Sequence, residues 1–276
     1  ISYCTQKGDG WHLMTRAEWA AIALWCKANG CLPKGNNNYG KDASEGGYKA
    51  IPAPGVNDSG RTARVLTGTG PVSWSHDGTL EGIWDLNGNI WEWNGGSRTV
   101  KGELQVLVNN NAADLDHSQA ASSAQWKAID ATTGAYITPN GSGTTANSIK
   151  LDWVSGKITY SATITTQADT SRDCAFASVT CASSVSAAAQ AVLKALAFLP
   201  ASATASEYED DHMWMNNGAD ERAFYSGGNW NNGANAGLFA LNGNNPRSNS
   251  NWNLGFRSAL PNSQMLTAQG LSPSTW

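Results

Sequence analysis

Charged residues are scarce in this chain. Asp, Glu, Lys and Arg make up only 14% of the 276 residues, and the formal net charge at pH 7 is −4. No segment gathers Lys and Arg into a stripe, which argues against the phosphate contacts that drive nucleic-acid binding. No apolar run approaches the eighteen or so residues that a membrane-spanning helix needs. We therefore expect neither a nucleic-acid partner nor insertion into a membrane.

The cysteines do not have the spacing of a zinc site or of a C-x-x-C redox site. They are Cys4, Cys26, Cys31, Cys174 and Cys181. Cys26 is close enough in sequence to pair with Cys31, and Cys174 with Cys181, but the odd total leaves one thiol over. A chain of this length buries enough core to fold without cross-links, so we expect free thiols or occasional pairing rather than a disulfide framework.

Motifs of catalysis and metal binding are also missing. The four histidines lie in neither H-x-x-x-H nor H-E-x-x-H spacing, and the sequence around His76 offers no nucleophile elbow. The acidic run 207–212 is either a solvated loop or a weak site for a divalent cation. Glu92 is either a buried carboxylate or a partner of a bound cation. We predict no enzymatic activity and no required cofactor; a structural divalent cation stays possible, with its ligands unknown.

Helix signals are few, while glycine (29) and tryptophan (13) are abundant. Thr15 and Glu18 form a capping-box pattern, apolar residues then recur at helical spacing, and Gly30 provides a stop. This pattern predicts an amphipathic helix from Thr15 to Gly30. A second periodic run predicts a helix over 186–198, which a following proline ends.

The rest of the chain has the pattern of short strands and long loops. Residues 36–70 are rich in Gly, Asn and Pro and are predicted to be mostly loop. An Asn-Gly turn at 87–88 leads into a strand in which Ile90, Trp91 and Trp93 are expected to be buried anchors.

Beyond this strand, segments 103–108, 148–153 and 157–165 are strand-like and are separated by turns. We expect an α+β fold with few helices, short strands, long loops and a large β-rich insertion. Its parts are residues 1–96 as the first part of the core, 97–215 as the insertion and 216–276 as the closing part.

The most unusual segment is 229–253, in which ten of twenty-five residues are asparagine. Each carboxamide has two donors and two acceptors that need partners when buried, so this density disfavours a packed core. Tryptophan, leucine and phenylalanine lie among the asparagines and need anchoring, so disorder is also disfavoured. The combination predicts an ordered binding surface that presents short polar side chains from an apolar frame.

Three motifs resemble formylglycine-generating-enzyme-like proteins, a branch of the C-type lectin fold. Residues 13–19, L-M-T-R-A-E-W, resemble the L-P-T-E-A-E-W helix start of that branch. Residues 82–93, G-I-W-D-L-N-G-N-I-W-E-W, resemble its G-L-x-D-M-x-G-N-V-W-E-W signature. Residues 226–230, S-G-G-N-W, and the G-F-R at 255–257 resemble its closing motif. The resemblance implies a C-type lectin fold that the insertion interrupts.

Within this superfamily the asparagine pattern resembles the variable proteins of diversity-generating retroelements. In that family a reverse transcriptase copies a template with errors at adenines, so asparagine codons are mutable sites. The resemblance implies that the following positions are variable and contact the ligand: Asn232, Asn235, Asn242, Asn244, Asn245, Asn249, Asn251, Trp252 and Asn253. It also implies a scaffold that holds them: Trp91, Trp93, Trp230, Phe239, Phe256 and Arg257. Arg257 is expected to pin nearby carbonyls or a carboxylate.

The function implied by this resemblance is ligand binding without catalysis, directed at changing targets such as host-cell surface receptors. The partner would be a protein or glycan on a target cell, and the location a phage virion, in its tail or receptor-binding apparatus, or a cell surface. Two alternatives stay open: a calcium-dependent carbohydrate-binding lectin, although its E-P-N, Q-P-D and W-N-D motifs are absent, and a structural phage surface protein. The oxidase activity of the branch needs a C-terminal cysteine pair, and no cysteine lies beyond Cys181.

Overall fold

Helices form a small part of the molecule. The structure, a computed structural model, describes residues 1–202 and 204–260. The α-helices are α1 (Ser2–Thr5), α2 (Arg16–Asn29) and α3 (Ala187–Ala195). The 3₁₀ turns are η1 (Val72–Trp74), η2 (Val108–Asn110), η3 (Phe176–Ser178), η4 (Ala205–Tyr208) and η5 (Gly233–Asn235).

Short strands supply most of the regular structure. In the first half of the chain they are β1 (His12–Leu13), β2 (Asn57–Asp58), β3 (Arg61–Thr62), β4 (Trp91–Val100), β5 (Glu103–Leu107), β6 (Trp126–Ile129) and β7 (Tyr136–Ile137). In the second half they are β8 (Lys150–Val154), β9 (Lys157–Ser161), β10 (Arg172–Ala175), β11 (Thr180–Cys181), β12 (His212–Met215), β13 (Arg222–Ser226), β14 (Leu241–Asn245), β15 (Leu254–Phe256) and β16 (Ser258–Ala259). The predicted α+β class with few helices is confirmed.

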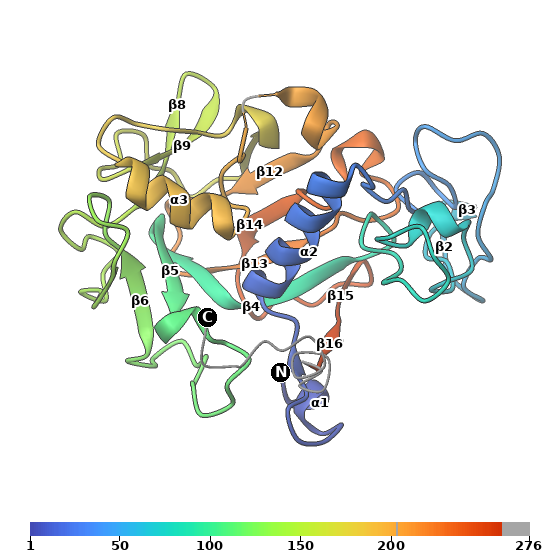
Figure 1. The fold of residues 1–276 in the computed structure, drawn as a ribbon, viewed down its shortest axis with the longest axis horizontal. Helices are drawn as coiled ribbons and strands as arrows, with labels where there is room; N and C mark the ends of the chain where they lie inside the picture. Colours follow the sequence, from blue (N-terminus) through green and yellow to red (C-terminus); the bar gives the residue numbers. More distant parts are fainter. Residues whose placement is uncertain (203, 261–276) are drawn as a thin grey trace.

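Twelve of the strands join into one mixed sheet (Figure 1). Its main path is β10-β12-β14-β13-β4-β5-β8-β9-β11; β15 pairs with β4, β6 with β5, and β7 with β6. Most pairs are antiparallel, but β12 and β14, β4 and β15, and β9 and β11 run parallel. The two remaining pairs, β1 with β16 and β2 with β3, stand apart from this sheet.

The helix α2 has the caps that the sequence predicts. The Thr15 hydroxyl accepts from the Glu18 amide, and the Glu18 carboxylate accepts from the Thr15 amide at 2.8 Å. Gly30 ends the helix with φ +66°, a left-handed conformation that favours glycine. The helix α3 begins after its cap Ser186 but ends earlier than predicted, because Ala197 turns to φ +49°.

The two faces of the sheet carry different side chains because neighbouring residues of a strand point to opposite sides. On one face Met213, Leu241 and Phe224 belong to the main core, which α2 and α3 cover (Figure 1). On the other face their neighbours Trp214 and Tyr225 join Trp91 in a separate aromatic cluster.

The segment predicted to be an insertion shares this sheet and core with the rest of the chain. Strand β4 crosses the predicted boundary at residue 96, and β5, β8 and β9 extend the sheet beyond it. Leu104 and Leu151 pack in the same core as Trp19 and Leu241. The assignment of 97–215 as an insertion stays a prediction about the sequence, and in the fold this stretch completes one sheet.

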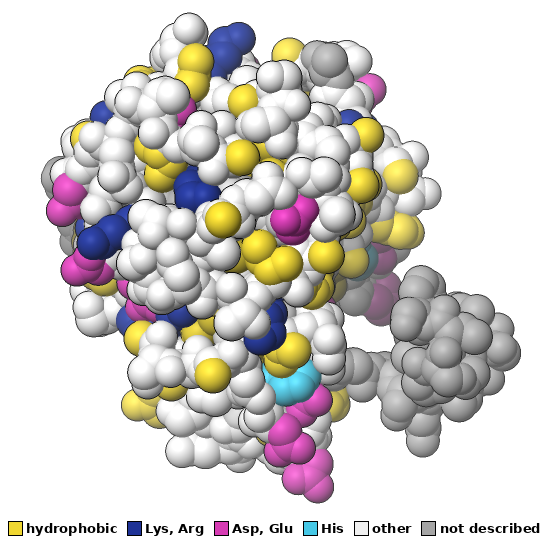
Figure 2. Space-filling model, turned by 90° about the vertical axis from the view of Figure 1, so that its left-hand side faces the viewer, with side chains coloured by type: hydrophobic (Ala, Val, Ile, Leu, Met, Phe, Trp, Pro, Cys, Tyr) yellow, Lys and Arg dark blue, Asp and Glu magenta, His cyan; other side chains and the backbone are white. Residues whose placement is uncertain are grey.

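The surface has few charges. Figure 2 shows one side of the molecule, on which Lys and Arg side chains are dispersed among uncharged ones. In the described residues, no helix combines the length and apolar character that crossing a bilayer requires.

Candidate functional site

The centre of the candidate site is a row of side chains that crosses five neighbouring strands. Trp214 of β12 lies opposite Asn242 of β14, which lies opposite Tyr225 of β13. Tyr225 in turn lies opposite Trp93 of β4, and Trp93 opposite Phe256 of β15. We call this side of the sheet the aromatic face.

Edge-to-face ring contacts hold the aromatic face together. The Trp91 ring lies 5.4 Å from Trp214 and 5.1 Å from Tyr225, and the Trp93 ring lies 5.0 Å from Tyr225, all nearly perpendicular. Such pairs add about 0.5–1.5 kcal/mol each beyond the burial of their area. Trp91 is buried as expected, whereas Trp93 is half-buried. The rings form a stiff base beneath the asparagine-rich segment.

Two strands of the sheet, β14 and β15, flank the last loop of the asparagine-rich segment. Strand β14 lies between β12 and β13, and β15 pairs with β4. Between them, residues 246–253 form a loop whose end is fixed where the Trp91 amide donates to the Asn253 carbonyl at 2.9 Å. The loop backbone is therefore held at both ends by strands, and within the loop the Asn251 carboxamide oxygen accepts from the Trp252 amide at 2.8 Å.

The nine predicted variable positions differ in exposure. Asn251 and Trp252 are exposed. Six others are half-buried: Asn232, Asn235, Asn244, Asn245, Asn249 and Asn253. Asn242 is buried, with 7% of its surface exposed, so its prediction as a solvent-facing position is wrong. The reason is its place in β14, between Trp214 and Tyr225 on the aromatic face.

Several of these carboxamides bond within the protein. The Asn245 amide donates to the Tyr225 hydroxyl, and the Asn244 amide donates to the Ser171 hydroxyl at 2.6 Å. The Asn232 carboxamide oxygen accepts from the Asn229 amide at 2.8 Å, within its own loop. In the 246–253 loop Arg247 is bound to Glu221 and the Asn251 oxygen accepts from the Trp252 amide at 2.8 Å, so the other side chains of this loop have the most freedom to meet a ligand.

Two of the predicted scaffold residues behave as expected in the core, and one does not. Trp230 and Phe239 are each 1% exposed. Phe256 is 47% exposed and stacks on Tyr3, with ring centroids 6.3 Å apart. Phe256 lies on β15 and faces outward beside Trp93. The spacing of the closing motif does not predict this exposure.

Arg257 holds the end of the segment to the sheet. Its guanidinium donates to both Glu92 oxygens, at 2.8 and 2.7 Å, and to the Trp84 carbonyl at 2.9 Å. Burial alone would lower the pKa of Arg257, but the Glu92 carboxylate raises it above its ordinary value. The prediction that Arg257 pins nearby carbonyls or a carboxylate is confirmed, since it bonds to one of each, and Glu92 uses both oxygens on Arg257.

A second loop, which carries β2 and β3, lies beside Trp252. The sequence alone does not predict this arrangement. The Trp252 ring lies 4.5 Å from the Trp230 ring, and the Trp230 indole donates to Asp58 at 3.1 Å. This bond holds the pKa of Asp58 below its ordinary value. Arg61, from the same hairpin, stacks on Tyr39 at 3.6 Å. These residues are far apart in sequence and no local pattern marks them, so only the fold brings them together.

Metal sites are not apparent in the described part of the chain, where no group of three or more His, Cys, Asp or Glu side chains is placed to hold an ion. In the acidic run, His212 lies 3.1 Å from Asp173, Glu207 lies 2.6 Å from Lys27, and Asp211 is buried. The members of the run thus point to different partners.

No protein-family model matches the sequence, and no curated protein matches it at a significant level.

Proposed function

We propose that this chain is a non-catalytic ligand-binding protein of the C-type lectin fold, in its formylglycine-generating-enzyme-like branch. Its asparagine-rich segment is the variable site of a diversity-generating retroelement protein, and it recognises changing targets such as receptors on a host-cell surface. The contact residues are those of the 246–253 loop, above all Asn249, Asn251 and Trp252, with Asn244 and Asn245 at its edge. Asn242 belongs to the frame.

The observation that carries the proposal is the separation of frame from contact side chains. The loop is held by β14, by β15 and by the ion pair of Arg257 with Glu92, none of which uses the side chain of Asn249 or Asn251. A stiff base that presents exchangeable side chains is how antibody loops reach many targets. Aromatic residues such as Trp252 supply contact area at small entropic cost.

Burial changes the acidity of two of the thiols. Burial raises the pKa of Cys26 to about 12, with Cys31 adding to the shift, and burial raises the pKa of Cys181 to about 11. Thiols with such values are protonated at neutral pH and are poor nucleophiles.

The proposed partner is a protein or glycan on the surface of a target cell, met from a phage virion or from another cell surface. Affinity at a single small site is modest, and several copies on one particle raise it through effective concentration. Exposed loop positions tolerate exchange because they carry no core packing.

Sequencing of sibling copies of the gene tests the proposal. We expect differences among copies to concentrate at Asn244, Asn245, Asn249, Asn251 and Trp252, with Asn242 changing less often. An adjacent reverse-transcriptase gene and a near-copy of the closing segment are expected beside them. Variation scattered evenly over the chain, without enrichment at these codons, would refute the assignment.

A further inference from the structure

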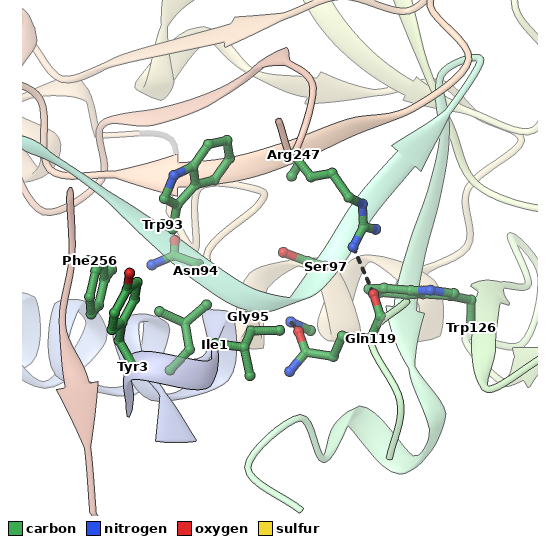
Figure 3. Close-up of a pocket in the computed structure, with 13 residues that line it drawn as sticks. Ile1, Tyr3, Trp93, Asn94, Gly95, Ser97, Gln119, Trp126, Arg247 and Phe256 are labelled. Atoms are coloured by element: carbon green, nitrogen blue, oxygen red, sulfur yellow. Dashed lines mark hydrogen bonds between the residues drawn. The ribbon is translucent and has the colours of Figure 1, made fainter. Parts of the chain in front are cut away.

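Two cavities near the candidate site differ in the charge that they offer a ligand. The cavity beside β4 is walled by rings, among them those of Trp93 and Phe256 (Figure 3). Of the described residues, Arg247 alone brings a charged side chain to it, and its guanidinium is bound to both oxygens of Glu221, each at 2.6 Å. That cavity therefore presents no free charged side chain.

The second cavity lies between the loop 38–48 and strand β3 and has a volume of about 390 Å³. This volume falls in the range of roughly 300–1,000 Å³ that is typical of small-molecule sites. The Tyr39 amide donates to the Trp230 carbonyl at 2.8 Å, so the cavity adjoins the pair of Trp230 and Trp252. Its lining residues are Asn38, Tyr39, Lys41, Gly47, Tyr48 and Arg61.

Two cations and no acid line this second cavity. Within the described part of the chain, neither Lys41 nor Arg61 takes part in an ion pair. Asp58, from the same hairpin as Arg61, does not line the cavity and accepts from the Trp230 indole at 3.1 Å. The whole chain has a net charge of −4, so this positive charge is a local feature. An anion is the ligand that would balance it.

The turn that carries Tyr39 has an uncommon backbone conformation. The Asn38 amide donates to the Lys41 carbonyl at 2.9 Å, and Tyr39 between them has φ +53°. Bulky residues rarely adopt a left-handed φ, and strain of this kind concentrates at functional sites. Here the Tyr39 ring lies against the Arg61 guanidinium, whose carbon is 3.6 Å from the ring centroid.

This stacking orients Arg61 without using up its donors. The guanidinium has five N–H groups. Among the described residues, the Tyr39 hydroxyl is the one group that accepts from it, at 2.6 Å. Arg61 therefore keeps donors for an anion, and the neutral ring of Tyr39 leaves its charge uncompensated.

Tyr48 forms an apolar wall of the cavity. Its side chain is 69% exposed, yet its ring packs closely on Gly40, where a Cβ atom would lie 2.6 Å from the ring carbon Cδ1. The Lys49 amide donates to the Gly40 carbonyl at 3.0 Å and holds the two segments together. The Tyr48 ring thus has a defined place beside the two cations.

We infer that this cavity binds an organic acid about the size of one ring, with its carboxylate on Lys41 and Arg61 and its ring against Tyr48. The fork of arginine donors matches the geometry of a carboxylate, and lysine adds a point charge. The volume favours a whole small molecule or a terminal acidic sugar over a single acidic side chain. All the lining residues lie outside the asparagine-rich segment, so the inference does not depend on the proposed function.

Ligand-observed NMR at low ionic strength tests the inference with two matched pairs of probes. The acids are benzoate and methyl glucuronide, and their neutral counterparts are benzamide and methyl glucoside. We expect saturation transfer to at least one acid, and binding of its neutral counterpart that is at least about fivefold weaker. Transfer to the glucuronide identifies an acidic sugar as the ligand class, and transfer to benzoate alone identifies an aromatic acid; either result supports the inference.

Three variants test the residues. Lys41→Gln and Arg61→Gln should each weaken binding of the acid about three- to tenfold, as expected for one partly exposed charged contact. Lys49→Gln is the matched control, because Lys49 is exposed and adjacent to Tyr48 but does not line the cavity. It removes the same charge and should weaken binding less than about twofold.

Thermal unfolding followed by circular dichroism checks that the variants are folded, and since all three positions lie at the surface we expect small changes in melting temperature. Three results would overturn the inference: no transfer to either acid, equal binding of each acid and its neutral counterpart, or equal weakening in Lys41→Gln and Lys49→Gln.

Discussion

At the scale of single residues, two tryptophans of the candidate site differ in how deeply they are buried. Trp91 is 6% exposed and meets Trp214 and Tyr225 edge to face, whereas Trp252 is 45% exposed and meets Trp230 from the loop. We predict that Trp91→Ala lowers the free energy of unfolding by about 3–5 kcal/mol, as core deletions of large aromatic residues do. Urea denaturation measures the loss, and Trp252→Ala, expected to cost about 1 kcal/mol or less, is the control. Equal losses in the two variants would contradict the division into frame and contact residues.

Asp211 is a second residue whose burial has a measurable consequence. One of its oxygens accepts from the Phe239 amide at 2.7 Å, while the other lacks a partner in the described chain. Burial, aided by the nearby Glu209, raises the pKa of Asp211 well above its ordinary value. The folded state therefore keeps a proton that the unfolded chain releases near pH 4.

From this shift we predict a pH-dependent difference between the wild type and Asp211→Asn. Stability from the protonated carboxyl is full below about pH 4 and is lost as pH rises toward the folded pKa, by at most about 1.4 kcal/mol per pH unit. Asparagine cannot ionise, so the variant should gain melting temperature relative to the wild type from pH 4 to pH 8. A difference that stays constant over this range would mean that Asp211 is ionised when folded.

At the scale of elements, α2 is the clearest case of a structure set by its own sequence. The reciprocal bonds of Thr15 and Glu18 begin it, and Gly30 ends it. Thr15→Ala should therefore cost about 0.5–2 kcal/mol of stability, measured by thermal or chemical denaturation. Thr180→Ala, at an exposed position of β11, should change stability by less than about 0.5 kcal/mol. A cap variant as stable as this control would show that packing alone holds α2.

Elements with local signals were predictable, and those set by distant partners were not. The segments 103–108, 148–153 and 157–165 correspond to β5, β8 and β9, because turns bound them and their residues favour strands. The burial of Asn242 follows from the strands on either side of β14, and the exposure of Phe256 follows from the open side of β15. Neither neighbour is visible in the local sequence.

At the scale of the whole molecule, the loops contain two kinds of asparagine. Asn36, Asn87 and Asn89 are buried and bond to one another's loops; for example, the Asn87 amide donates to the Pro33 carbonyl at 2.9 Å. Asn249 and Asn251 lie on the loop between β14 and β15, outside this network. The same residue type thus fastens loops to one another in one region and, in our proposal, presents an exchangeable surface in the other.

The most direct test is to randomise each set in a displayed library and to measure the fraction of members that resist protease. With Asn249, Asn251 and Trp252 randomised, we predict that most members stay folded. With Asn36, Asn87 and Asn89 randomised, we predict that few do, because buried carboxamides lose their partners. Comparable losses in the two libraries would contradict the claim that the loop is an exchangeable recognition surface on an independent frame.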